Sequence, residues 1–190
     1  MSFARWYKFM VRWEGGYSND KYDLGGETNK GVTWKTFLWI APRLGIPPTR
    51  EVFLAMPQEV HERIARFFYD MFKGVPWEGL RFYLADFRWG SGGAIKVIQK
   101  ELNRRLPRKI EEDGIWGPET EKSFITWVNI VGPCVALKKL DEWRRKYVLE
   151  YVPKVAPQTR RFVRGWRRRI NEGYEIAYDL EGCGRKKNSS

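Results

Sequence analysis

Apolar residues recur with helical spacing along most of this 190-residue chain. The first helix is predicted from one apolar face at positions i, i+3, i+4, i+7 and i+8: Phe3, Trp6, Tyr7, Met10 and Val11. Gly15 and Gly16 follow directly and are suited to end this helix. Further helices are predicted over residues 33–41, 49–56, 57–74, 79–93, 94–106, a short stretch after Pro118, 133–151 and 160–178.

One stretch breaks the helical period. Residues 17–32 are rich in Gly, Asn and Asp, which is typical of a hairpin or an irregular loop. The sequence therefore predicts a mainly α fold with a small β-hairpin or loop near residues 17–32. No linker interrupts the chain, so residues 3–178 are predicted to form one compact unit. Residues 182–190 are polar and basic, which predicts a disordered tail.

The charge points to a polyanionic partner. The chain carries 35 Lys and Arg against 23 Asp and Glu, a net charge of +12. Residues 1–100 hold 15 basic and 10 acidic side chains (+5), and residues 101–190 hold 20 and 13 (+7), so the excess is spread over both halves. Nucleic acid, an anionic lipid surface and the bacterial cell wall all fit such a charge.

Other site classes find no support in the sequence. The chain has two cysteines, Cys134 and Cys183, and one histidine, His61, which is interpreted as a surface or half-buried helix residue. This is too few ligands for a structural zinc site, and no cofactor is expected. Whether the two cysteines pair is left open. No apolar run approaches the length of a membrane span, and no secretory signal pattern is present at the N-terminus.

Glu14 is the candidate for acid chemistry. It lies eleven residues after Phe3, so it returns to the apolar face at the C-terminal end of the first helix. Burial and the negative end of the helix dipole both predict a raised pKa for its carboxyl group. A carboxylic acid that keeps its proton near neutral pH is what a glycosidase needs to protonate a leaving oxygen.

A second carboxylate is expected in the polar loop that follows. Asp20 and Asp23 both lie there and are expected to stay ionised, so either can hold a water or stabilise an oxocarbenium-like transition state. Thr28 can help to position that water. The same residues also fit an ordinary helix end and turn, because Asn-Asp and Gly-Gly pairs are common turn chemistry.

The stretch Glu14–Thr33, EGGYSNDKYDLGGETNKGVT, resembles the signature of the glycoside hydrolase family 108 lysozymes, the N-acetylmuramidases of phages and bacteria. In that family the Glu of Glu-Gly-Gly-Tyr is the catalytic acid, which the resemblance carries over to Glu14. The set Glu14, Asp23 and Thr28 is also similar to the Glu, Asp and Thr of phage-type lysozymes, with Thr28 one residue early. Substrate contacts are assigned to four further side chains: Tyr17, Asn19, Asn29 and Trp89.

The resemblance continues downstream. LADFRWGSGGAIKVIQKELN and DGIWGPET are similar to the family's C-terminal peptidoglycan-binding segment, although Gly90 stands where the family usually has Asn. The unit 3–178 is thus divided into a catalytic segment, 3–89, and a peptidoglycan-binding-like helical segment, 90–178. The Gly-Pro at 117–118 also fits a turn that starts a helix.

These observations favour a muramidase that cleaves the β-1,4 bond between N-acetylmuramic acid and N-acetylglucosamine in peptidoglycan. We expect a monomer that is made in a host cytoplasm without a signal peptide and acts on the wall after release. A noncatalytic wall-glycan-binding protein of the same fold is the alternative. A nucleic-acid binder is disfavoured, because basic residues alternate with acidic ones and no nucleic-acid motif is present. The peptidoglycan chemotype, the choice between inversion and retention and the phage or bacterial origin stay open.

Overall fold

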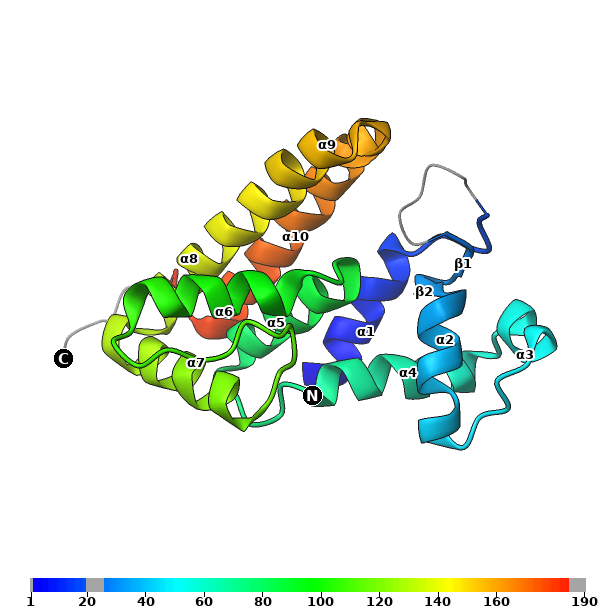
Figure 1. Cartoon of the computed structure of the whole chain (residues 1–190), viewed down its shortest axis with the longest axis horizontal. Helices are drawn as coiled ribbons and strands as arrows, with labels where there is room; N and C mark the ends of the chain where they lie inside the picture. The colour runs from blue at the N-terminus through cyan, green and yellow to red at the C-terminus, as the bar shows by residue number, and fades with distance from the viewer. Residues whose placement is uncertain (1, 20–25, 185–190) are drawn as a thin grey trace.

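The computed structural model describes residues 2–19 and 26–184 (Figure 1). The elements in chain order are α1 (Ser2–Trp13), β1 (Thr28–Asn29), β2 (Val32–Thr33), α2 (Trp34–Ile40), the 3₁₀ turn η1 (Pro42–Leu44), α3 (Arg50–Ala55), α4 (Gln58–Asp70), α5 (Glu78–Gly90), α6 (Ala94–Arg105), α7 (Pro118–Val131), α8 (Pro133–Arg145), the π-helical turn η2 (Lys146–Tyr151), α9 (Val152–Val155), the 3₁₀ turn η3 (Pro157–Phe162) and α10 (Val163–Glu181). The mainly α, lysozyme-like class predicted from the sequence is confirmed.

Helix α5 lies at the centre of the larger hydrophobic core. It packs against α1, α4, α6, α8 and α10, and nearly all of its middle residues are buried. Its start lies close to α10: a Cβ placed on Gly79 would lie 2.2 Å from the carbonyl oxygen of Ala177. Glu181 accepts hydrogen bonds from the backbone N–H groups of Gly79 and Leu80, so a carboxylate from α10 caps the start of α5.

The small sheet is a two-stranded antiparallel hairpin, as predicted for part of residues 17–32. Thr28 pairs with Thr33 and Asn29 with Val32. The two turn residues, Lys30 and Gly31, both have positive φ, which matches the right-handed twist of a tight hairpin.

A second hydrophobic cluster lies behind this hairpin. It contains Val32, Phe37, Ile40, Phe53 and Ile64, from β2 and helices α2, α3 and α4. Thr33 caps α2 as predicted, since its side chain accepts a hydrogen bond from the backbone N–H of Thr36. The indole of Trp89 packs against both the larger core and this cluster. The end of α5 therefore lies between the two.

Two of the predicted helices differ from what forms. On α1, Val11 is exposed and Phe9 is buried, because the side facing α5 is centred on Trp6, Phe9 and Met10. Residues 133–151 are helical throughout, but α8 widens into the π-helical turn η2 after Arg145, and the helix continues as α9. The widening precedes Pro153, which has no N–H to donate to the preceding turn.

The start of the predicted disordered tail is ordered. Gly182 ends α10 in a left-handed conformation, and Cys183 forms a disulfide with Cys134 at the start of α8. Residues 182–184 are therefore tethered to α8 by a disulfide. The sequence alone left open whether these two cysteines pair. The rest of that segment, residues 185–190, lies outside the described residues.

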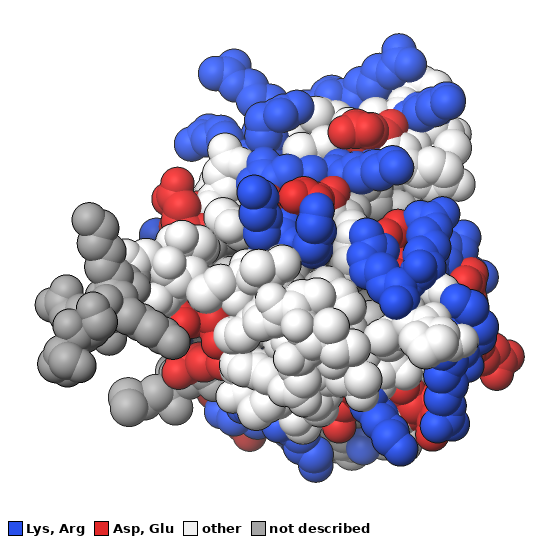
Figure 2. All heavy atoms as spheres, turned by 90° about the vertical axis from the view of Figure 1, so that its left-hand side faces the viewer, with Lys and Arg blue, Asp and Glu red and all other residues white. Residues whose placement is uncertain are grey.

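Positive charge is less evenly spread than the two halves of the sequence indicate. Figure 2 shows Lys and Arg side chains gathered at the top of the molecule, where η2, α9, η3 and the start of α10 lie. Residues 146–168 hold seven basic residues and a single acidic one, Glu150, a net charge of +6. Within the described part of the chain, no helix combines the length and apolar character needed to span a membrane.

Candidate active site

Glu14 follows the last residue of α1 and lies partly buried, with 13% of its side chain exposed. One carboxylate oxygen, Oε1, accepts hydrogen bonds from the indole Nε1 of Trp89 at 2.9 Å and from Nη1 of Arg169 at 2.6 Å. The other oxygen, Oε2, accepts no hydrogen bond from the described residues. The apolar setting expected from helical phase is therefore corrected: an indole and a guanidinium hold this carboxylate.

The guanidinium of Arg169 continues into a buried chain of charges. Its Nη2 also donates to Oδ1 of Asp86 at 2.7 Å, and Nη2 of Arg144 donates to Oδ2 of the same carboxylate at 2.7 Å. Asp86 is fully buried, and burial alone raises its pKa. The two guanidinium groups outweigh burial, so the pKa of Asp86 lies below its ordinary value. Glu14, Arg169, Asp86 and Arg144 thus alternate in sign from the site into the core.

Arg169 is held as a cation by this arrangement. Burial favours its neutral form, but Asp86 and Glu14 raise its pKa above the ordinary value. The guanidinium carbon of Arg144 lies over the rings of Tyr83 and Phe87, 5.0 and 5.5 Å from their centroids. Because α5, α8 and α10 each contribute one charged residue, the position of Glu14 depends on how these three helices pack.

Trp89, which was predicted to contact substrate, has its indole turned to Glu14. Its ring meets Trp6, His61 and Phe68 edge to face, at centroid distances of 5.5 to 5.9 Å. These three contacts fix the ring plane and with it the direction of the N–H that binds Glu14. Trp89 therefore acts here as a positioning residue for the carboxylate.

The hairpin turn closes over the other side of the carboxylate. A Cβ on Gly31 would lie 2.2 Å from Oε2 of Glu14 and 2.9 Å from Nε1 of Trp89. The hairpin is fixed to α3, since Asn29 donates to the carbonyl oxygens of Phe53 and Leu54 at 2.8 and 2.9 Å. Glycine at position 31 therefore lets the backbone approach Glu14 this closely.

Gly31→Ala is expected to lower activity far more than stability. The methyl group would displace the Glu14 carboxylate, and a misplacement of about 1 Å costs on the order of 10²-fold in rate. Gly26→Ala is the matched control, because Gly26 has a similar positive φ (68° against 78°) but nothing within 4 Å of the added carbon. Turnover of purified cell walls and thermal unfolding would be measured for both. Equal losses of turnover would show that backbone strain, and not the contact with Glu14, is responsible.

His61 supports the same turn from α4, and its assignment as a surface or half-buried residue is corrected: it is 3% exposed. Its Nε2 lies 2.9 Å from the carbonyl oxygen of Lys30, and its Nδ1 lies 2.9 Å from the hydroxyl of Tyr7. A carbonyl only accepts, so Nε2 carries the proton and Tyr7 donates to Nδ1. The sequence did carry a signal for this burial: His61 lies on the same side of the helix as Ile64 and Phe68, which form the buried face of α4.

The pKa of His61 is lowered, chiefly by burial, against the opposing effects of the Lys30 carbonyl and of Glu14. The unfolded chain binds this proton more readily than the folded one, so the contribution of His61 to stability is present above about pH 6.5 and is lost as the pH falls below it. We expect the melting temperature to drop between pH 7.5 and pH 5 by more in the wild type than in His61→Gln. Parallel pH profiles would contradict this assignment.

Three further predicted site residues, Tyr17, Asn29 and Thr28, make hydrogen bonds within the hairpin region and to α3. Tyr17 is exposed and donates to Glu27, which also pairs with Arg50. Asn29 is buried, and its amide holds the hairpin to α3, so a structural role replaces the predicted sugar contact. The side chain of Thr28 donates to the carbonyl of Gly26 at 3.0 Å.

The last three predicted site residues, Asn19, Asp20 and Asp23, follow α1 in the sequence. Asn19 is exposed. Asp20 and Asp23, the two candidates for the second carboxylate, lie outside the described residues. Of the predicted site residues that the structure describes, Glu14 and Trp89 are the two brought together.

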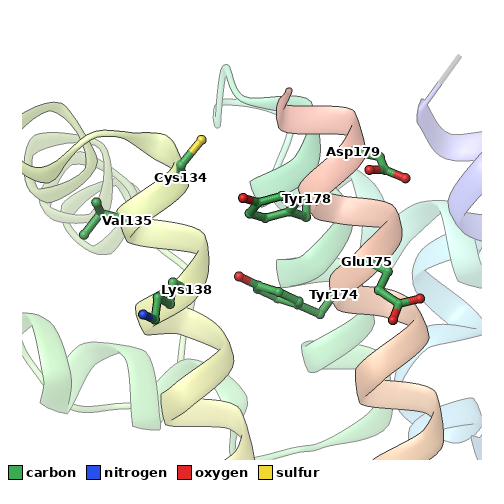
Figure 3. Close-up of a pocket in the computed structure, with 7 residues that line it drawn as sticks. All are labelled: Cys134, Val135, Lys138, Tyr174, Glu175, Tyr178 and Asp179. Atoms are coloured by element: carbon green, nitrogen blue, oxygen red, sulfur yellow. The ribbon is translucent and has the colours of Figure 1, made fainter. Parts of the chain in front are cut away.

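Two surface hollows lie away from Glu14. One, about 680 Å³, lies between α8 and α10; in Figure 3 Tyr174 and Tyr178 point from α10 toward Lys138 and Cys134 on α8. The other, about 600 Å³, is lined by η1, α4 and Trp116. Among residues 2–19 and 26–184, no group of three or more His, Cys, Asp or Glu residues could hold a metal ion.

Part of the chain matches a family model, and nearly all of it matches the fold of a solved structure. Residues 7–92, a little under half of the chain, match the model of the family described as Glycosyl hydrolase 108, which supports a glycoside hydrolase assignment. The solved structure titled "Structure of Brucella abortus SagA" is similar over 99% of this chain and 98% of that one, with a TM-score of 0.70 and 22% identity. At that identity the similarity shows the fold. No curated protein matches.

The matched segment contains Glu14, Gly31, His61 and Trp89, but Arg169 lies outside it. The glycoside hydrolase assignment and the position of Glu14 thus support each other. The peptidoglycan-binding character of residues 90–178 stays a prediction.

Proposed function

We propose that this chain is a lysozyme-type peptidoglycan hydrolase that cleaves the β-1,4 glycosidic bond between N-acetylmuramic acid and N-acetylglucosamine. The observation that carries the proposal is Glu14, a partly buried carboxylate held by Trp89 and Arg169 within the segment that matches a glycoside hydrolase family. The net charge of +12 suits an anionic substrate such as the bacterial wall. Action on the wall after release from a host cytoplasm is part of the same proposal.

In this mechanism Glu14 is the general acid. Both donors bind Oε1, which leaves Oε2 to carry the proton and deliver it to the glycosidic oxygen. Arg169 and Trp89 fix the direction of that oxygen, and Gly31 leaves room beside it. The reaction consumes one water and needs no cofactor: the C–O bond to the leaving sugar breaks, the leaving oxygen takes the proton of Glu14, and water supplies the new hydroxyl. The other proton of that water passes to a carboxylate of the site, which restores the protonated acid.

A second carboxylate completes the chemistry, and Asp23 and Asp20 are the candidates. Asp23→Asn and Asp20→Asn should separate them: the partner of Glu14 should lose activity by about 10²-fold or more, and the other should lose little. We favour Asp23 for its nine-residue offset from Glu14. Lysis rates of both variants, with unchanged melting temperatures as the control for folding, decide the assignment. Equal, small losses in both would exclude the two aspartates from this role.

Mass spectrometry of digested peptidoglycan tests the reaction itself. Fragments with a new reducing-end muramic acid would support a muramidase. A new reducing-end glucosamine would place the cut at the other glycosidic bond, and new free amines would mean peptide cleavage. Binding to walls without any product would favour the alternative, a noncatalytic wall-binding protein of this fold.

A further inference from the structure

Residues 146–168 form a projecting part of the molecule, which we call the basic arm. It comprises η2, α9, η3 and the first residues of α10, and in Figure 1 it extends beyond the layer formed by α5, α6 and α7. The chain reverses at Ala156 and Pro157, between α9 and η3. Glu14 meets the base of this arm through Arg169, so the tip lies away from the candidate active site.

The charge of the basic arm is almost entirely positive and exposed. Seven basic side chains are exposed on it, against one acidic side chain, Glu150: Lys146, Lys154, Arg160, Arg161, Arg164, Arg167 and Arg168. Apart from Arg161, these residues make no ion pair within the described part of the chain. Elsewhere on the surface, charged side chains more often pair, as Arg108 does with Glu119 and Lys139 with Glu142. The arm therefore presents uncompensated charge, visible at the top of Figure 2.

Apolar side chains are exposed among these charges. Tyr151 is 54% exposed and Val155 is 58% exposed, and because they are four residues apart they lie on the same side of a helix. Tyr151 stacks on Tyr147 with ring centroids 5.7 Å apart. The pair Tyr151 and Val155 precedes the chain reversal, so aromatic and aliphatic groups lie near the end of the arm.

We propose that the basic arm is a peripheral docking surface for an anionic phospholipid bilayer. Lys and Arg at a membrane surface are attracted by anionic headgroups, while Tyr and short aliphatic side chains enter the interfacial region. The arm offers both kinds of group together. A soluble polyanion such as a nucleic acid would use the charges but would leave Tyr151 and Val155 in water. The lipid surface is thus the partner that uses both the basic and the apolar side chains exposed on the arm.

The docking is superficial and independent of catalysis. No described helix is long and apolar enough to span a bilayer, so only side chains at the tip enter the interface. With the tip on a membrane, Glu14 would stay at the base of the arm. The site would then act on polymer lying next to the bilayer.

Vesicle flotation of the full chain tests this. The probe is phosphatidylcholine vesicles with and without phosphatidylglycerol, at low and physiological salt. We expect binding to the anionic vesicles alone, weakened by salt. Replacing Lys154, Arg160, Arg164 and Arg167 together by Gln should lower the affinity on the order of 100-fold. The control replaces Lys35, Lys73, Lys100 and Lys122 by Gln, an equal change in net charge away from the arm, and should change affinity less than about fivefold.

The double variant Tyr151→Ser with Val155→Ser tests the apolar part. It keeps every charge and should lower vesicle affinity about tenfold, with an unchanged melting temperature. Equal losses in the two charge variants would overturn the proposal, because the attraction would then be diffuse. So would wild-type vesicle affinity in the double variant, or binding to DNA or polyphosphate without binding to vesicles. Catalytic activity enters none of these readouts, so the outcome is separate from that of the proposed hydrolase function.

Discussion

Glu14→Gln is expected to reduce wall lysis by about 10²–10⁴-fold while fold and wall binding persist. Gln keeps the shape of the side chain, and its amide oxygen can still accept from Trp89 and Arg169, which donate at 2.9 and 2.6 Å in the wild type. It cannot donate a proton to a glycosidic oxygen as an acid does. Release of reducing sugars from purified peptidoglycan measures the loss, and sedimentation with intact walls measures binding.

Glu172 provides a matched control for this substitution. Its carboxylate also accepts from an indole and a guanidinium, those of Trp13 and Arg12, on the neighbouring surface of α10. Glu172→Gln therefore repeats the chemical change with the same kinds of partner and should leave lysis close to the wild-type rate. If Glu14→Gln lyses walls as fast as Glu172→Gln, Glu14 is not the acid and the Glu-Gly-Gly-Tyr stretch is only a helix end and turn.

Asp86→Asn is expected to lower the free energy of unfolding by about 3–5 kcal/mol. The substitution keeps the size of the side chain but leaves the buried guanidinium group of Arg144 without a counter-charge and Arg169 with Glu14 as its one acidic partner among the described residues. Desolvation of these cations is then no longer offset by attraction to the carboxylate. Urea denaturation, analysed for both midpoint and slope, measures the change.

The control for Asp86 is an exposed ion pair. Glu119 lies 2.7 Å from Arg108, and both side chains are more than half exposed. Solvent screens such pairs, so Glu119→Gln should cost less than about 1 kcal/mol. A loss for Asp86→Asn as small as that of Glu119→Gln would mean that the buried network does not stabilise the fold. Asp86→Asn should also lower lysis, because Arg169 would lose the partner that aims it at Glu14.

The helices and the place of the hairpin could be predicted from the sequence because both depend on local pattern. Apolar spacing, the Thr33 cap and the glycines after Trp13 each act within a few residues, and most of the predicted helices formed close to where they were expected. Local pattern was misleading where contacts with distant elements decide which side of a helix is buried. Val11 and Phe9 are equally apolar, and only the position of α5 buries one and exposes the other. The π-helical widening at η2 likewise precedes Pro153, a residue outside the segment that widens.

The site was predicted in part. Glu14 stands in a dense motif, but its partners come from helices far along the chain, and no spacing rule links position 14 to position 169. Asp86 did carry a signal, since an acidic residue inside the apolar run of α5 must find a buried partner. The sequence could not show which of the 35 Lys and Arg residues would be the partner of Asp86. Asn29 was assigned to substrate, whereas its amide donates to two backbone carbonyls of α3.

The contact between Glu14 and Arg169 also sets an order of events during synthesis. The two residues are 155 positions apart, and a ribosome adds about 5–20 residues per second, so roughly 8–30 s separate their appearance. During that interval α1 and the hairpin can form locally, but the carboxylate lacks its guanidinium partner. The nascent chain thus carries Glu14, the proposed acid, before its partners exist, and the proposed hydrolase site is complete only when α10 packs against α5.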